Sequence, residues 1–337
     1  MDTGGSTEGK RDDGGCALLE VENLTTGFSR GSRTVIAVDD VSFSVREGET
    51  LALVGESGSG KSVTALSIMR LVEPPGRILG GSIHFRGRDL MTLSEGELRG
   101  LRGGEIALIF QEPMTALNPV FTVGDQIAET LVVHGRAGWN AARAQAIELI
   151  EAVRVPEAAR RAHDYPHQLS GGQRQRIMIA IALACRPALV IADEPTTALD
   201  VTIQAEILDL LREMKRAFGL SLLLITHDLG VVGEMADRVA VMYAGRIVEE
   251  SPVRAFFESP QHPYSRGLLA SLPRGAGSRR LHTIEGTVPS PEHLPPGCAF
   301  EPRCPERLEA CRAAVPPLHL INKDRSARCI RLDGAAR

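Results

Sequence analysis

The sequence predicts an α/β fold with a mostly parallel central sheet, and three observations carry this prediction. A glycine-rich stretch, residues 55–62, follows an apolar run and precedes a helical pattern. From residue 173 to residue 243, apolar runs alternate with helical periodicity, as in strands joined by crossover helices. An acidic pair, Asp193-Glu194, ends one of these runs, at the edge where parallel sheets hold ligands.

The first part of the chain predicts an antiparallel β-subdomain. Short segments alternate apolar and polar side chains and are bounded by Gly, Glu and Arg. A helix over 62–70 continues the glycine-rich stretch. We expect strands at residues 18–24, 41–45, 50–54 and 82–85, and a further core strand at 106–110.

A helical subdomain is inserted at about residues 112–170, because apolar side chains recur there at a spacing of three to four. The alternating pattern then resumes. We expect helices at 173–185, 202–217 and 230–236, and strands at 189–193, 221–225 and 238–243.

Composition indicates where the main domain begins and ends and limits the classes of function. The main domain spans residues 17–250, preceded by a disordered leader, 1–16, and followed by a small cysteine-containing C-terminal appendage, 251–337. The net charge of −4 gives no global attraction to nucleic acid or anionic lipid. No apolar stretch is long enough to span a membrane, so any membrane role requires partner subunits.

The glycine-rich stretch has the spacing that wraps backbone N–H groups around phosphates at a helix N-terminus. Lys61 would supply positive charge, and Ser62 would offer a hydroxyl to Mg²⁺. The alternative is a plain glycine-rich turn. The candidate phosphate-binding residues are Gly55, Glu56, Ser57, Gly58, Ser59, Gly60, Lys61 and Ser62.

Polar residues follow three of the expected strands. Asp193 stands where a magnesium ligand should, and Glu194 where a general base for water would. His227 could reach the outermost phosphate, and Gln111 could join the Mg²⁺ or water shell. The alternative for Asp193-Glu194 is a solvated strand end. His227 could instead be a capping histidine, and Gln111 an ordinary polar loop residue.

Leu169-Ser170-Gly171-Gly172-Gln173 precedes a helix and forms a second candidate anion site. It has neither Lys nor Mg²⁺ and would bind weakly alone. Two subunits arranged head to tail, each covering the nucleotide of the other, would use both sites. A simple helix cap is the alternative, but it would not explain both glycines.

Four cysteines lie within the last forty residues: Cys298, Cys304, Cys311 and Cys329. With no secretion signal, a metal is favoured over disulfides. Zn²⁺, an iron–sulfur cluster and unmetallated thiols are the alternatives. The Cys-x2-Cys knuckle of zinc sites is absent, and the wider spacing favours a cluster.

Together these motifs resemble an ATP-binding cassette (ABC) ATPase, a P-loop NTPase. In its terms they are the Walker A motif 55–62, Q-loop Gln111, signature 169–173, Walker B ending at Asp193-Glu194, D-loop Ala198-Leu199-Asp200 and H-loop His227. The resemblance implies ATP and Mg²⁺ as ligands and a dimer around two ATP molecules. It also implies that Phe28 stacks on adenine and that Ser170 and Gly172 bind the γ-phosphate of the opposing ATP.

Residues 111–119 and three tail segments, 262–265, 286–289 and 296–305, resemble the dipeptide/oligopeptide/nickel importer branch. This implies a peripheral protein at the cytoplasmic face of the inner membrane that energises peptide import. The implied partners are two permease subunits, a second related ATPase rather than a second copy, and an extracytoplasmic binding protein, with no nucleic acid. The resemblance also implies a [4Fe–4S] cluster on the four cysteines.

Three alternatives remain open. The cargo could be nickel or another small solute. The chain could be a non-transport ABC ATPase that acts on DNA or ribosomes, although such proteins usually carry coiled coils, zinc modules or a second cassette. The cysteine tail could also act as a sensor that regulates the ATPase.

Overall fold

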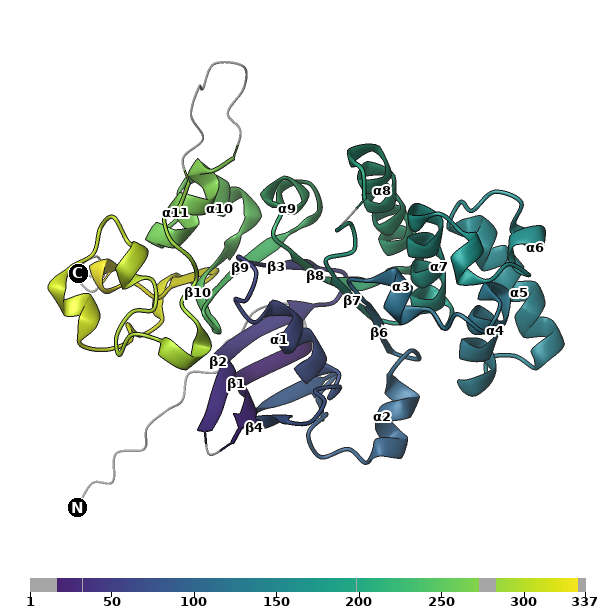
Figure 1. The fold of residues 1–337 in the computed structure, drawn as a ribbon, viewed down its shortest axis with the longest axis horizontal. Helices are drawn as coiled ribbons and strands as arrows, with labels where there is room; N and C mark the ends of the chain where they lie inside the picture. Colours follow the sequence, from purple (N-terminus) through teal and green to yellow (C-terminus); the bar gives the residue numbers. More distant parts are fainter. Residues whose placement is uncertain (1–16, 32, 198, 273–282, 333–337) are drawn as a thin grey trace.

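The computed structural model describes residues 17–31, 33–197, 199–272 and 283–332. The expected leader and Ala198 of the expected D-loop lie outside the described residues. Two sheets form the framework, a four-stranded sheet ordered β2-β1-β4-β5 and an eight-stranded sheet ordered β11-β12-β10-β9-β3-β8-β7-β6. Figure 1 shows the helices α3 to α8 gathered at one end of the larger sheet and the C-terminal segment at the other.

The four-stranded sheet is antiparallel and is the expected β-subdomain. Its strands are β1 (Ala17–Arg30), β2 (Arg33–Arg46), β4 (Gly76–Phe85) and β5 (Arg88–Asp89). The first three are longer than expected from the sequence. Bulges interrupt the register between β1 and β2, and Asn23 and Asp40 adopt left-handed backbone conformations. These irregularities break the alternation by which a strand is recognised in a sequence.

The centre of the larger sheet is parallel, as the alternating pattern predicts. Its strands are β3 (Thr50–Val54), β6 (Ile106–Ile109), β7 (Leu189–Asp193), β8 (Ser221–Thr226) and β9 (Arg238–Tyr243). The expected bounds of β3, β7 and β9 are confirmed. All residues of β3, β7, β8 and β9 are buried, which is why these strands form continuous apolar runs.

Helices cover the sheet and form the inserted subdomain. They are α1 (Lys61–Ile68), α2 (Glu95–Leu101), α3 (Pro113–Ala116), α4 (Val123–Val133), α5 (Trp139–Ala152), α6 (Ala158–Arg161), α7 (Gly171–Leu183), α8 (Val201–Phe218) and α9 (Leu229–Met235). The short helices α2 and α3 were not expected, because neither is long enough to show a helical period. Among the described residues, no helix is both long and apolar enough to cross a membrane.

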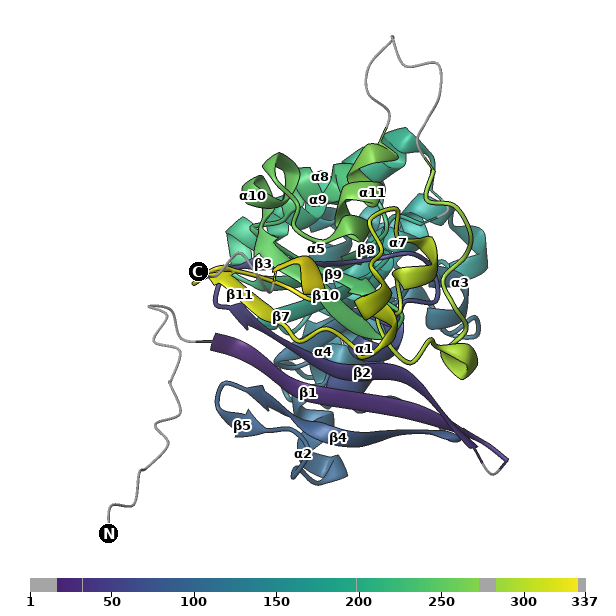
Figure 2. The same ribbon diagram turned by 90° about the vertical axis from the view of Figure 1, so that its left-hand side faces the viewer.

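The C-terminal segment continues the main sheet. After β10 (Arg246–Pro252) come α10 (Val253–Glu258), α11 (Pro263–Ala270), β11 (His319–Asn322) and β12 (Arg325–Ala327). Strand β12 pairs with β10, and β11 pairs with β12. Tyr264 and Phe300 share one hydrophobic cluster with Tyr243 of β9. Figure 2 shows this segment facing the viewer, packed beside β10 and above β2.

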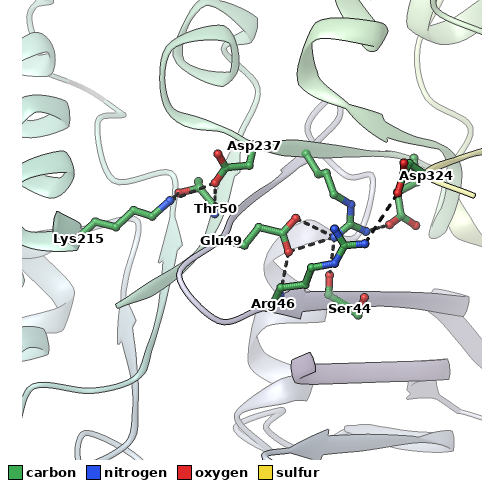
Figure 3. A network of polar contacts seen from close by, with 9 residues as sticks. Ser44, Arg46, Glu49, Thr50, Lys215, Asp237 and Asp324 are labelled. Carbon is green, nitrogen blue, oxygen red and sulfur yellow. Dashed lines mark hydrogen bonds and ion pairs between the residues drawn. The ribbon is translucent and has the colours of Figure 1, made fainter. Parts of the chain in front are cut away.

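A polar network joins the elements at the start of β3 (Figure 3). The guanidinium of Arg238 bonds both carboxylate oxygens of Glu49, at 2.8 and 3.1 Å, and also pairs with Glu250. Asp237 accepts the N–H of Thr50 at 2.7 Å. Glu49 and Arg238, the buried charged groups of this network, are therefore paired with each other within the chain.

Candidate nucleotide site

The parallel register brings four strand ends to one edge of the sheet. Val54 pairs with Thr226, Asp193 with Ile225, and Ile109 with Ala192. The loops that follow β3, β8, β7 and β6 therefore begin side by side. They carry residues 55–62, His227, Glu194 and Gln111, which are far apart in the sequence.

The loop after β3 curls around the ammonium group of Lys61. Its Nζ donates to the carbonyl oxygens of Gly55, at 2.8 Å, and Glu56, at 3.1 Å. Lys61 is almost fully buried, and this burial lowers its pKa, although Glu194, Asp193 and Glu56 favour the charged form. The loop thus holds its cation at the N-terminus of α1, where an anion is also favoured by the helix dipole.

Two glycines of this loop are required by close approach. A Cβ on Gly55 would lie 2.2 Å from the carbonyl oxygen of Met242 in β9. Gly60 has φ of 103°, and a Cβ there would lie 2.6 Å from the carbonyl oxygen of Ala37. The backbone therefore packs directly against β9 and β2, and a side chain at either position would displace it.

Asp193, at the end of β7, fits the expected magnesium ligand. Its carboxylate is buried and bonds the hydroxyl of Ser62. Burial raises its pKa, as does the charge of Glu194, while Ser62 and Lys61 lower it. Its Oδ1 has no hydrogen-bond partner among the described residues. A buried, unpaired carboxylate oxygen beside a hydroxyl is the donor set that Mg²⁺ prefers.

Glu194 is the centre of a polar cluster. Its Oε2 accepts from Gln111 Nε2 at 3.2 Å and from Thr197 Oγ1 at 2.7 Å, and its Oε1 lies 3.3 Å from His227 Nδ1. Burial raises the pKa of Glu194, but the hydrogen bonds of Thr197 and His227 and the charges of His227 and Lys61 outweigh it, so the pKa is lowered. The residue stays ionised and can accept a hydrogen bond from water.

The structure thus brings Gln111, Asp193, Glu194 and His227 together near Lys61. Thr197 was missed at the sequence level. It lies three residues beyond Glu194, inside Pro195-Thr196-Thr197, and only the tight turn after β7 (Thr197 N–H to Glu194 O, 3.1 Å) directs its hydroxyl back to the carboxylate. Glu194 itself has φ of 46°, an uncommon conformation that reorients its side chain relative to the strand.

Ser170 caps α7. Its Oγ accepts the N–H of Gln173 at 3.3 Å, and the Gln173 side chain accepts the N–H of Ser170 at 3.0 Å. This capping box is the simpler alternative that the sequence left open, and it accounts for Ser170 and Gln173 within one chain. A Cβ on Gly172 would lie 2.9 Å from Ile203 Cγ2, whereas Gly171 has an ordinary neighbour at 3.9 Å, Leu199. Close packing therefore explains Gly172 but not Gly171.

The remaining candidates are placed as follows. Phe28 lies in β1 opposite Gly76 of β4, and its half-buried ring covers that glycine. Ser57 and Gly58 are exposed, and Ser59 is buried. Of the expected D-loop, Asp200 caps α8 by accepting the N–H of Ile203 at 2.9 Å.

The four clustered cysteines line one cavity of about 20 Å³ together with His262 and Phe300. Burial raises the pKa of Cys298 and Cys329, and it raises the pKa of Cys304 to about 11. Within the described residues, no three His, Cys, Asp or Glu side chains form a group that could hold a metal ion. The cavity gathers the thiols, but as placed they do not form a site for a single ion such as Zn²⁺.

Comparison with known proteins agrees with this geometry. Residues 38–197 match the family model of the ABC transporter, and residues 248–311 match that of the oligopeptide/dipeptide transporter C-terminal region. The chain is 54% identical to the "Putative peptide import ATP-binding protein BMEII0863" of Brucella melitensis, covering 93% of this chain and 97% of that protein. It is 52% identical to the "Oligopeptide transport ATP-binding protein AppD" of Bacillus subtilis, covering 93% and 96%.

Among solved structures, the chain is similar to the ATP-binding cassette MJ0796, described as a dimer in a post-hydrolysis state bound to ADP and Pi. The TM-score is 0.64 at 29% identity, and the match covers 70% of this chain and 99% of that one. The fold is therefore the mixed α/β ABC cassette with its antiparallel β-subdomain. The chain belongs to the ABC transporter ATP-binding proteins, in the oligopeptide/dipeptide import branch.

Proposed function

We propose that this chain binds and hydrolyses ATP to drive the import of di- and oligopeptides through partner membrane subunits. The convergence of four strand ends on Lys61, Asp193 and Glu194 supports the ATPase role. The two peptide-import relatives and the matching C-terminal region support the cargo class.

In this proposal the residues have separate tasks. Residues 55–62 and Lys61 bind the phosphates, and Ser62, Asp193 and Gln111 hold Mg²⁺, which neutralises charge on the phosphates when it is bound. Glu194 orients the attacking water and accepts its proton, and His227 contacts the γ-phosphate. Thr197 is added as the donor that fixes the Glu194 carboxylate.

The adenine and the second subunit complete the site. We place Phe28 against the adenine ring, on the β-subdomain side of the phosphate loop. The helix that follows the phosphate loop, α1, and the helix that follows Ser170, α7, lie apart in Figure 1. Ser170, Gly171, Gly172 and Gln173 would therefore act on the ATP of the opposing subunit. The opposing subunit would be a related ATPase rather than a second copy of this chain.

The assembly would also hold two permease subunits and an extracytoplasmic substrate-binding protein, at the cytoplasmic face of the membrane. A reconstitution experiment tests this. Vesicles that contain the assembled transporter should hydrolyse ATP faster when binding protein and an oligopeptide are added, and they should take up the peptide. Stimulation by nucleic acid, or uptake of Ni²⁺ without peptide uptake, would contradict the proposal.

We also propose that Cys298, Cys304, Cys311 and Cys329 hold a [4Fe–4S] cluster. Four thiols around one cavity supply the donor set of such a cluster. Anaerobic purification followed by iron and sulfide analysis and a visible spectrum decides the question. Four iron atoms per chain would support the cluster, and stoichiometric zinc or no metal would exclude it.

A further inference from the structure

The C-terminal segment reaches the phosphate loop through one acidic residue, Glu56. Arg303 donates from Nη1 to Glu56 Oε2 at 2.7 Å and from Nη2 to Glu56 Oε1 at 3.0 Å. The side chain of Arg303 is only 5% exposed. The two residues are 247 positions apart in the sequence. The Glu56 side chain is one-third exposed. A bidentate pair between a guanidinium and a carboxylate is stronger and more directional than an ordinary ion pair.

Arg303 is itself held on every donor. In addition to the two bonds of the guanidinium to Glu56, its Nη1 donates to Tyr243 Oη at 3.4 Å. Its Nη2 donates to the carbonyl oxygen of Ile284 at 3.3 Å, and its Nε donates to the carbonyl oxygen of Glu285 at 2.9 Å. All five N–H donors of the guanidinium therefore have acceptors. The bond to Glu56 raises the pKa of Arg303 above its already high ordinary value. The side chain is fixed in place and permanently charged.

A second contact holds the backbone of the same residue. The N–H of Glu56 donates to Tyr264 Oη at 3.0 Å. Tyr264 belongs to α11 and is fully buried, and its ring packs 4.6 Å from that of Tyr243 and 5.4 Å from that of Phe300. The Glu56 carbonyl, in turn, accepts from Lys61 Nζ. Glu56 is thus fixed between the cation of the loop and two residues of the C-terminal segment.

Glu56 is electrostatically unfavourable for phosphate binding unless it is neutralised. It is a negative charge inside a loop that receives a polyphosphate. Its charge favours the protonated form of Lys61, although burial lowers the pKa of that residue overall. Arg303 neutralises this charge and holds the Glu56 carboxylate through two hydrogen bonds from its guanidinium. The ammonium group of Lys61 is then available to the ligand.

We propose that Arg303 and Tyr264 are positioning residues of the phosphate loop: the C-terminal segment neutralises Glu56 and fixes its backbone, and so sets the affinity for ATP. This inference rests on the proposed nucleotide site. It assigns the segment a task at the ATP of its own chain, separate from any group on the cysteines.

The test compares Arg303→Ala, Arg303→Lys, Tyr264→Phe and the double variant Glu56→Ala/Arg303→Ala in the full-length chain. Arg254→Ala is the matched control, because Arg254 and Glu258 form an exposed ion pair on α10 of the same segment. The affinity for a non-hydrolysable ATP analogue with Mg²⁺ is measured by calorimetry. KM and kcat for ATP are measured in the assembled transporter, and melting temperatures check folding.

We expect Arg303→Ala to weaken analogue binding and to raise KM by about tenfold, with kcat changed less than about threefold. Arg303→Lys should lie between the wild type and Arg303→Ala, since it keeps the charge but loses the fork. Removal of Glu56 as well should restore most of the affinity. Tyr264→Phe should weaken binding by a few fold, and Arg254→Ala should change nothing.

The inference is overturned if Arg303→Ala binds within twofold of the wild type, or if the double variant is as weak as Arg303→Ala. If Arg303→Ala fails to fold, Arg303→Lys and the double variant decide between the same outcomes. Lys61→Ala separates this inference from the proposed site. If Lys61→Ala keeps full affinity, the nucleotide site is wrong; if only Lys61→Ala loses affinity, the site holds and the role of Arg303 is wrong.

Discussion

The parallel sheet has two ends, one where its strands start and one where they finish, and these ends differ in how completely their polar groups are satisfied. At the end where β3 starts, Nη1 of Arg238 donates to both carboxylate oxygens of Glu49. The N–H of Thr50 there donates to Asp237 (Figure 3). At the other end, Asp193 Oδ1 is buried without a partner among the described residues, and Glu194 adopts a left-handed conformation. One end is complete within the chain, and the other has capacity left for a ligand.

The difference shows how one sheet can serve both stability and chemistry. A buried charge without a partner is costly unless a ligand or metal completes it. The unsatisfied end therefore identifies the binding site, and the satisfied end anchors it. Mutations at the unsatisfied end should affect turnover or affinity, and mutations at the satisfied end should affect folding.

The largest expected effect is on turnover. Glu194→Gln keeps the size of the side chain but removes the charge that accepts a proton from water. We expect ATP hydrolysis to fall by about 10²–10⁴-fold, with ATP still bound and the melting temperature little changed. Steady-state hydrolysis and nucleotide-binding assays on the same preparation measure both. An unchanged rate would remove Glu194 from the role of general base.

At the opposite end, Arg238→Ala leaves the buried carboxylate of Glu49 without its cationic partner. We expect a loss of about 3–5 kcal/mol in the free energy of unfolding, measured by chemical denaturation. Adding Glu49→Gln should recover part of this loss, because the buried charge of Glu49 is then removed as well. If Arg238→Ala costs less than about 1 kcal/mol, the two ends do not differ as described.

Substitution of two glycines in the phosphate loop should have an intermediate effect on stability and on ATP binding. Gly55→Ala places a methyl group against the carbonyl oxygen of Met242 and should cost about 1–3 kcal/mol and weaken ATP binding. Gly58→Ala is the matched control: its added Cβ would meet nothing within 4 Å, and only the positive φ opposes it, at about 1–2 kcal/mol. Equal effects on ATP affinity would show that contact with β9 does not shape the loop.

The smallest effect is expected at Lys215, which bonds Thr50 Oγ1 at 2.7 Å and Asp237 at 3.1 Å. Asp237 is largely exposed, so water can replace this pair. Lys215→Met should change the free energy of unfolding by no more than about 1 kcal/mol and leave hydrolysis unchanged. A larger loss of stability would show that the contact of α8 with the start of β3 also stabilises the sheet.

Much of the fold and site could be predicted from the sequence because the signals are local. Strands β3, β7 and β9 are continuous apolar runs, since both faces are buried, and their expected bounds are those of the structure. The phosphate loop and the acidic strand end have fixed spacings. The long strands β1 and β2 were only partly expected, because bulges and left-handed residues interrupt their alternation.

By itself the sequence determined the class of protein and the candidate residues of the nucleotide site, because glycine spacing, charge at strand ends and apolar periods are properties of adjacent residues. Only the tertiary structure decided which distant groups meet. Thr197 turns back onto Glu194, Ser170 and Gln173 cap one another, and Arg303 closes on Glu56 across most of the chain. Side-chain partners depend on the packing of whole elements, and no local pattern encodes the distance between residues 56 and 303.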